Sequence, residues 1–191
     1  FVASASSLLS DQASRRAFAN LLAGIPDDQK RSFYINKLAN HWSKFLTFAE
    51  AASIVDSLDD NIPETMRLRI ACSAEGADYA TRFAWLLHGV ADSQRENAIS
   101  TAVLQWTHAD FNAVATFLSD LQPSSDRDQA VGIFADMVAS TEPPSAVDWA
   151  LTIDDARHRD RVLQRIYTSW STTHKQAARD YFAEKKLRIA E

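Results

Sequence analysis

The side chains best suited to metal binding or nucleophilic chemistry are five histidines and one cysteine. The histidines are His41, His88, His108, His158 and His174. Their spacing matches neither a zinc site nor a His-Glu-x-x-His helix. Cys72 follows Ala71 in a stretch that reads as helix, which favours a packed, unreactive thiol over a nucleophile. We therefore predict no catalytic residue, no metal ligand and no cofactor, and we expect a protein that is not an enzyme.

Three acidic doublets are further candidates for a charged site. They are Asp27-Asp28, Asp59-Asp60 and Asp154-Asp155, which recur at similar places along the chain. Together they could form an acidic ridge that binds cations or a basic partner. Acids at the start of a helix also stabilise its positive end, and we favour this structural interpretation.

Four arginines recur in register. Arg95, Arg127 and Arg159 fall 32 residues apart (95, 127, 159), and two such steps lead back from Arg95 to Arg31. Each is expected in the first turn of a helix, where the helix dipole disfavours a cation. The arginines could bind an anion, but pairing with an acid of a neighbouring turn, such as Asp92 or Asp120, is the simpler interpretation.

The same 32-residue step relates bulky side chains. It relates Trp85, Phe117, Trp149 and Tyr181, and a double step relates Trp42, Trp106 and Trp170. After each arginine, apolar residues at the third, fourth, seventh, eighth and eleventh positions form one helical face. In the first copy these are Tyr34, Ile35, Leu38, Ala39 and Trp42. In the second copy Arg67 interrupts the face. A fixed period of this size is typical of a solenoid of helical hairpins.

We therefore expect an all-α protein, a right-handed α-α superhelix of about five hairpins with ten or eleven helices and no sheet. It would be a single helical-repeat domain, residues 1–191. A half repeat at 8–25 would contain a helix at Ser10–Ala23 with Ala13, Ala17, Phe18, Leu21 and Leu22 on its apolar face. The hairpins are expected at about 29–58, 61–90, 93–122, 125–154 and 157–188, with short second helices at Asn112–Leu121, Ser145–Ile153 and Gln176–Leu187.

Composition supports this class of fold. Hydrophobic residues make up 46% of the 191, and only 4 glycines and 5 prolines are available for tight turns. The net charge of −5 argues against nucleic acid as a partner. No apolar run is long enough for a membrane span. Because the sequence begins with Phe1, we expect a processed product of an extracytoplasmic or membrane-tethered protein.

Tandem helix pairs of this length resemble the tetratricopeptide-type α-solenoids. The period is 32 where that family has roughly 34, and the Trp-x-x-Leu-Gly-x-x-Tyr signature is absent. The repeat has Arg-Asp/Glu-x-Ala opening one helix, as at Arg95 and Arg127, and a final Trp before an Ala-Ala/Ala-Val-x-x-Trp helix. This pattern resembles arrays in uncharacterised bacterial repeat proteins. The resemblance implies a fold and no functional residue.

The face of the first helices opposite the apolar stripe is the candidate partner surface. Its predicted binding residues are Phe33, Lys37, Leu68, Arg69, Leu104, Ile133 and Arg165, with Asn97, Gln129 and Arg161 beside them. Such a mixture suits a groove for a protein or peptide, and it equally suits a helix wedged between neighbouring hairpins. We expect a non-catalytic interaction scaffold. The alternative is a helical regulatory or substrate-holding domain of a larger enzyme that lies outside this sequence.

Overall fold

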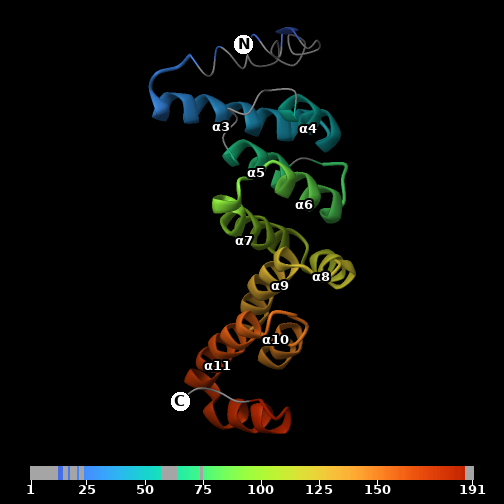
Figure 1. Cartoon of the computed structure of the whole chain (residues 1–191), viewed down its shortest axis with the longest axis vertical. Helices are drawn as coiled ribbons and strands as arrows, with labels where there is room; N and C mark the ends of the chain where they lie inside the picture. Colours follow the sequence, from blue (N-terminus) through green and yellow to red (C-terminus); the bar gives the residue numbers. More distant parts are fainter. Residues whose placement is uncertain are drawn as a thin grey trace. The chain divides into compact units, whose positions relative to one another are not determined.

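The computed structural model describes residues 24–56, 64–73 and 75–187, together with Ala13, Ser14, Ala17 and Leu21. Asp59, Asp60 and most of the helix expected at Ser10–Ala23 lie outside the described residues. Within the described ranges the secondary structure is helical, and Figure 1 draws no strand there. The protein is therefore all-α, as predicted. No helix in these ranges has the length and apolar character needed to span a membrane.

Nine helices are found in the described part of the chain. In order they are α3 (Asp28–Phe45), α4 (Phe48–Asp56), α5 (Glu64–Ser73), α6 (Tyr79–His88), α7 (Asp92–Ala109), α8 (Phe111–Asp120), α9 (Ser125–Val138), α10 (Pro143–Ala150) and α11 (Ala156–Glu184). Helix α11 contains the two helices expected in the last hairpin, and they meet at a kink where the backbone of His174 is non-helical (φ −138°, ψ 60°).

The chain divides into two compact units, Phe1–Ala98 and Ile99–Glu191, with the boundary inside α7. In the first unit α5 packs against α3, α4 and α6. In the second unit α9 packs against α8, α10 and α11, and α10 packs against α11. A single domain over residues 1–191 stays a prediction.

Residues expected on the apolar stripe of the first helices are buried in both units. The exposed fraction of the side chain is 0% for Trp42, 1% for Trp106 and 9% for Trp170. Other stripe positions are exposed by at most 4%: Ile35, Ala39, Ala98, Ile99, Ala102, Val103, Ala130, Val131, Phe134, Ala135, Val138, Val162, Leu163 and Ile166. The 32-residue register therefore marks the core. Three stripe positions are not buried: Leu38 and Tyr167 are half-buried, and Tyr34 is 52% exposed.

The aromatic residues of the second helices pack on the first helices of their own hairpins. The rings of Phe117 and Trp106 lie edge to face at 6.1 Å, and those of Trp149 and Phe134 at 4.9 Å. Phe117 is buried, and the other three members, Trp85, Trp149 and Tyr181, are half-buried.

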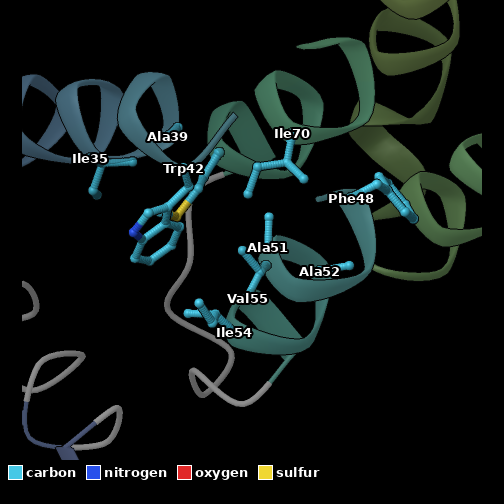
Figure 2. Close-up of a cluster of buried hydrophobic side chains, with 10 residues drawn as sticks. Ile35, Ala39, Trp42, Phe48, Ala51, Ala52, Ile54, Val55 and Ile70 are labelled. Carbon is cyan, nitrogen blue, oxygen red and sulfur yellow. The ribbon is translucent and has the colours of Figure 1, made fainter. Parts of the chain in front are cut away.

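Figure 2 shows the core of the first unit, where side chains of α3, α4 and α5 meet. The indole of Trp42 extends from α3 towards α4, and Ile70 extends from α5 into the same region. Ala51 and Val55 of α4 are 0% exposed. The small Ala51 side chain lets the helices approach closely, and the larger neighbours fill the remaining space.

The loops before α4 and after α5 are joined by their backbones. The amide of Phe48 donates to the carbonyl oxygen of Glu75 at 2.6 Å, and Thr47 forms an isolated bridge with Glu75. Gly76 follows with φ +90°, a conformation that favours glycine. Thr47 and Glu50 form a capping box at the start of α4, with the Thr47 amide donating to Oε2 of Glu50 at 2.9 Å. The Thr-x-x-Glu signature for this box is present in the sequence.

Arg67, which interrupts the apolar stripe, links three helices of the first unit. Its Nη2 lies 2.7 Å from Oδ1 of Asp56 on α4, and its guanidinium lies 4.8 Å from the ring of Trp85 on α6. The indole Nε1 of Trp85 donates to the other Asp56 oxygen at 2.9 Å. A side chain at Gly89 would collide with Arg67, so this glycine provides the space. Arg67 therefore interrupts the apolar stripe because it makes polar contacts between α5, α4 and α6.

The recurrent arginines bind backbone carbonyl oxygens, an acceptor that the sequence interpretation did not include. Arg31 donates to Ile25, Arg95 to Leu87, and Arg159 to Ile153, over 3.1, 2.9 and 2.9 Å. Ile25 and Ile153 lie just before the helices that carry Arg31 and Arg159, and Leu87 lies in the last turn of α6, the helix before α7. The arginines therefore fix the entry of the chain into the first helices.

Arg127 instead binds the following turn, together with its neighbour Asp128. The guanidinium of Arg127 donates to the carbonyl oxygen of Thr152 at 2.8 Å. The two oxygens of Asp128 accept the amides of Asp154 and Asp155 at 3.0 and 2.9 Å. Both side chains are buried. We call this arrangement the turn clamp, because α9 thereby holds the loop that leads into α11.

Helix-start acids and hydroxyls act as caps. Asp27 accepts the amides of Gln29 and Lys30 before α3, and Asp155 accepts the amide of His158 before α11. The structural interpretation is confirmed for these two acids. Before α9 the cap is Ser124, whose hydroxyl accepts the amide of Arg127 at 3.1 Å.

Candidate interaction surface

The described residues contain no group of three or more His, Cys, Asp or Glu side chains placed to hold a metal ion. Burial raises the pKa of Cys72 from 9.0 to about 12, against the opposing effect of Arg82 and Arg69. The thiol is therefore protonated at neutral pH and a poor nucleophile there. The partner surface proposed from the sequence is the remaining candidate site.

In the first unit, Phe33 and Lys37 form one patch on α3. Phe33 is 56% exposed, and Nζ of Lys37 lies 5.5 Å from the centre of its ring. The spacing of four residues places both on one side of the helix. This pair presents an apolar ring and a cation together, and both remain accessible to a partner.

Leu68 and Arg69 lie on α5, which packs against α3. Leu68 is half-buried and Arg69 is exposed. The neighbouring Ile70 is fully buried in the core of Figure 2. Helix α5 therefore turns one face inward and leaves Arg69 towards solvent.

In the second unit, Leu104 on α7 and Ile133 on α9 are the apolar members of the surface. Leu104 is 40% exposed, and Ile133 is half-buried. Their chain neighbours Val103 and Phe134 are 0% exposed. Neither side chain is fully buried, so both retain area that a partner could cover.

Arg165 on α11 is joined to Asp136 on α9 by a two-pronged ion pair. Nε and Nη2 of the guanidinium lie 3.0 and 2.7 Å from Oδ2 of the carboxylate. The side chains are 49% and 34% exposed. The pair holds Arg165 in one orientation at the seam of α9 and α11, beside the side of α9 that carries Ile133.

Arg161 lies one turn before Arg165 on the same helix. Its Nη2 donates to Nδ1 of His158 at 3.3 Å, and the other ring nitrogen of His158 is buried against Gly132 of α9. Gly132 allows this close approach of α11 to α9. The exposed Arg161 and Arg165 thus follow the seam between the two helices, with Arg165 fixed across it.

Exposed aromatic residues of α3 were missed by the sequence interpretation. Tyr34 was assigned to the core, and Phe45 was not assigned to any surface. Phe45 is 70% exposed, and the ring of His41 lies 4.5 Å from it. His41 and Phe45 are four residues apart in the sequence, and this spacing could have indicated that their rings are neighbours on one side of the helix.

In each unit the predicted binding residues combine apolar side chains with cations, a composition suited to binding another polypeptide. Comparisons with family models, curated proteins and solved structures found no match to this chain.

Proposed function

We propose that the protein is a non-catalytic scaffold that binds a protein or peptide on the face of its first helices opposite the apolar stripe. The observation that carries the proposal is the contrast within these helices. Most of their stripe side chains are buried, whereas Phe33 and Leu104 remain 56% and 40% exposed. Apolar side chains left in water on a polar surface are suited to burial by a partner.

Two cations among the predicted binding residues are held in place by neighbouring side chains. Arg165 is held by Asp136, and Lys37 rests on Phe33. A side chain that is already ordered loses less conformational entropy on binding. The proposed partner segment therefore has apolar anchors flanked by acidic groups.

We also propose that the repeated hairpins follow a right-handed, tetratricopeptide-like superhelical path. The support is the 32-residue register of Trp42, Trp106 and Trp170, all buried at the same place in their hairpins. In such arrays each repeat contacts chiefly its neighbours, so the exposed faces of successive first helices form an extended surface.

Selection of peptides from a displayed random library tests the proposed function. The bait is the whole chain, and every selected peptide is then measured against the double variant Leu104→Ser, Ile133→Ser. The proposal expects binding to be lost in this variant, with its thermal unfolding close to that of the wild type. Leu151→Ser is the control, because Leu151 is 37% exposed but lies in the turn after α10.

A further inference from the structure

The solvent side of α3 combines cations with aromatic rings. Since successive residues of an α-helix are rotated by about 100°, an arc of about 120° centred opposite Ala39 defines one side of α3. The residues in this arc are Lys30, Phe33, Tyr34, Lys37, His41, Lys44 and Phe45. All are exposed except His41, which is half-buried, whereas Ala39 is 0% exposed. We call this set the basic aromatic face.

The basic aromatic face is positive in a chain that is negative as a whole. The net charge of the chain is −5, yet the sequence has no acidic residue from Lys30 to the end of α3 at Phe45. Three of the six lysines of the chain, Lys30, Lys37 and Lys44, lie on this face at intervals of seven residues, which aligns them along about 20 Å of helix. Nζ of Lys30 lies 3.9 Å from Asp27, whose other oxygen caps α3. A line of like cations attracts an extended anionic surface.

Three aromatic rings project from the same face into water. Phe33, Tyr34 and Phe45 are 56%, 52% and 70% exposed. The rings of Phe33 and Tyr34 lie edge to face at 5.7 Å, and Nζ of Lys37 lies 5.5 Å from the centre of the Phe33 ring. Nearer the end of α3, the ring of His41 lies 4.5 Å from that of Phe45. An aromatic cluster therefore lies towards each end of the face.

The repeat does not require these residue types. Two 32-residue steps along the sequence lead from α3 to α7. The residues equivalent to the basic aromatic face are Gln94, Asn97, Ala98, Thr101, Gln105, His108 and Ala109. None of them is a lysine or a large apolar residue. The lysines and rings are therefore a property of α3, and solubility of a first helix does not depend on them.

We propose that the basic aromatic face of α3 binds the surface of a membrane rich in anionic lipid. The lysines reach the headgroup phosphates, while the rings enter the boundary between headgroups and acyl chains. Each lysine near such a surface strengthens binding about fivefold, the equivalent of about 1 kcal/mol. Two aromatic clusters spread along one side of a helix suit a flat apolar layer better than a single peptide anchor.

This inference goes beyond the proposed function and gives Phe33 and Lys37 a second ligand. Its variants leave Leu104 and Ile133 unchanged. Failure of the lipid proposal is therefore distinguishable from failure of the peptide proposal.

Flotation of the whole chain with lipid vesicles tests the proposal. The vesicles contain phosphatidylcholine alone or with about one third phosphatidylserine, which is anionic. We expect binding to the anionic vesicles only, and replacement of the three lysines of the face by glutamine should weaken it about a hundredfold. The matched control replaces the other three lysines of the chain by glutamine, which changes the net charge equally: Lys175, Lys185 and Lys186. This control should bind like the wild type.

The rings are tested separately. The double variant Phe33→Ser, Phe45→Ser should bind the anionic vesicles at least about tenfold more weakly, because two apolar side chains no longer leave water. The variant Phe33→Leu, Phe45→Leu should retain binding, since leucine also enters the boundary region. The unfolding temperatures should match that of the wild type, because both positions are exposed. Leu151→Ser, at a position 37% exposed in the second unit, is the control and should bind like the wild type.

Any of four results would overturn the proposal. One is absence of wild-type binding to the anionic vesicles. Another is an equal loss in the two lysine variants, since net charge and not the face would then control binding. A third is unchanged binding of the serine variant, because the rings would then not enter the membrane. The last is capture of a glutamate–tyrosine copolymer by the face without vesicle binding, which would assign the face to an acidic polypeptide.

Discussion

Arg165 of α11 and Asp136 of α9 face each other across a helix seam, with Nη2 and Oδ2 2.7 Å apart. A residue chosen from the sequence as a partner contact is thus already engaged within the chain. Because both side chains are partly exposed, water screens the attraction. The pair serves to orient the guanidinium more than to stabilise the fold.

The first prediction concerns this pair. Arg165→Ala and Asp136→Ala should each change the free energy of unfolding by less than about 1 kcal/mol. A double-mutant cycle measured by urea denaturation would give the coupling between them. A coupling well above this value would show that the pair is a main support of the α9–α11 contact. In the same variants, binding of selected peptides should fall more for Arg165→Ala than for Asp136→Ala.

The second prediction separates two tryptophans of the repeat. Trp106→Ala removes a side chain that is 1% exposed and should destabilise the second unit by about 3–5 kcal/mol. Trp149→Ala should cost less, roughly 2–3 kcal/mol, because its ring is half-buried on Phe134. Equal losses in denaturant unfolding would contradict the difference in burial.

The turn clamp gives the third prediction. Asp128→Asn replaces an oxygen that accepts a backbone amide by a group that donates, next to Asp154 and Asp155. The expected loss of stability is about 1–3 kcal/mol, since a part-buried amide is left without an acceptor. Asp160→Asn is the matched control, because Asp160 occupies the same repeat position and is exposed. A similar loss in both variants would rule out a specific role for the clamp.

The fourth prediction is a pH dependence of the first unit. The amide of Thr81 donates to Asp78 and that of Thr47 to Glu50, which holds the pKa of each carboxyl below its ordinary value of 3.8 or 4.5. A lowered folded pKa stabilises the fold above the unfolded pKa, and this stability is lost as the pH falls through the folded pKa. The urea midpoint should therefore hold from neutral pH to about pH 5 and then fall on acidification.

Substitution isolates this titration. In the variant Asp78→Asn, Glu50→Gln the polar caps remain but the carboxyl groups no longer ionise. Its urea midpoint should fall less between neutral pH and about pH 3 than that of the wild type. An unchanged fall would mean that other carboxyl groups cause the acid sensitivity.

The sequence predicts the core better than it predicts the surface, for a physical reason. The burial of Trp42, Trp106 and Trp170 follows from a period that is present in the residue types themselves. Tyr34 has the same period but is exposed. Burial also depends on which helices pack against a position, and the residue types of one repeat do not specify that packing.

Polar partners were harder to predict than apolar ones. The arginines were expected to pair with acids, yet Arg31, Arg95 and Arg159 donate to backbone carbonyl oxygens, which every residue possesses. The link from Arg67 to Asp56 joins α5 to α4, and the sequence pattern does not specify how these two helices pack. The partner surface was also hard to predict, because exposed and buried apolar residues of the first helices recur at the same spacing in the sequence.

The central claim, that the face of the first helices opposite the apolar stripe binds a polypeptide, is tested most directly by one comparison of affinities. Peptides selected on the whole chain are titrated against the wild type and against the Leu104→Ser, Ile133→Ser variant. We predict a loss of affinity of at least tenfold per buried leucine-sized anchor, about 1.4 kcal/mol, with the unfolding temperature nearly unchanged. Equal affinity for the two proteins would contradict the claim and would place the binding site elsewhere.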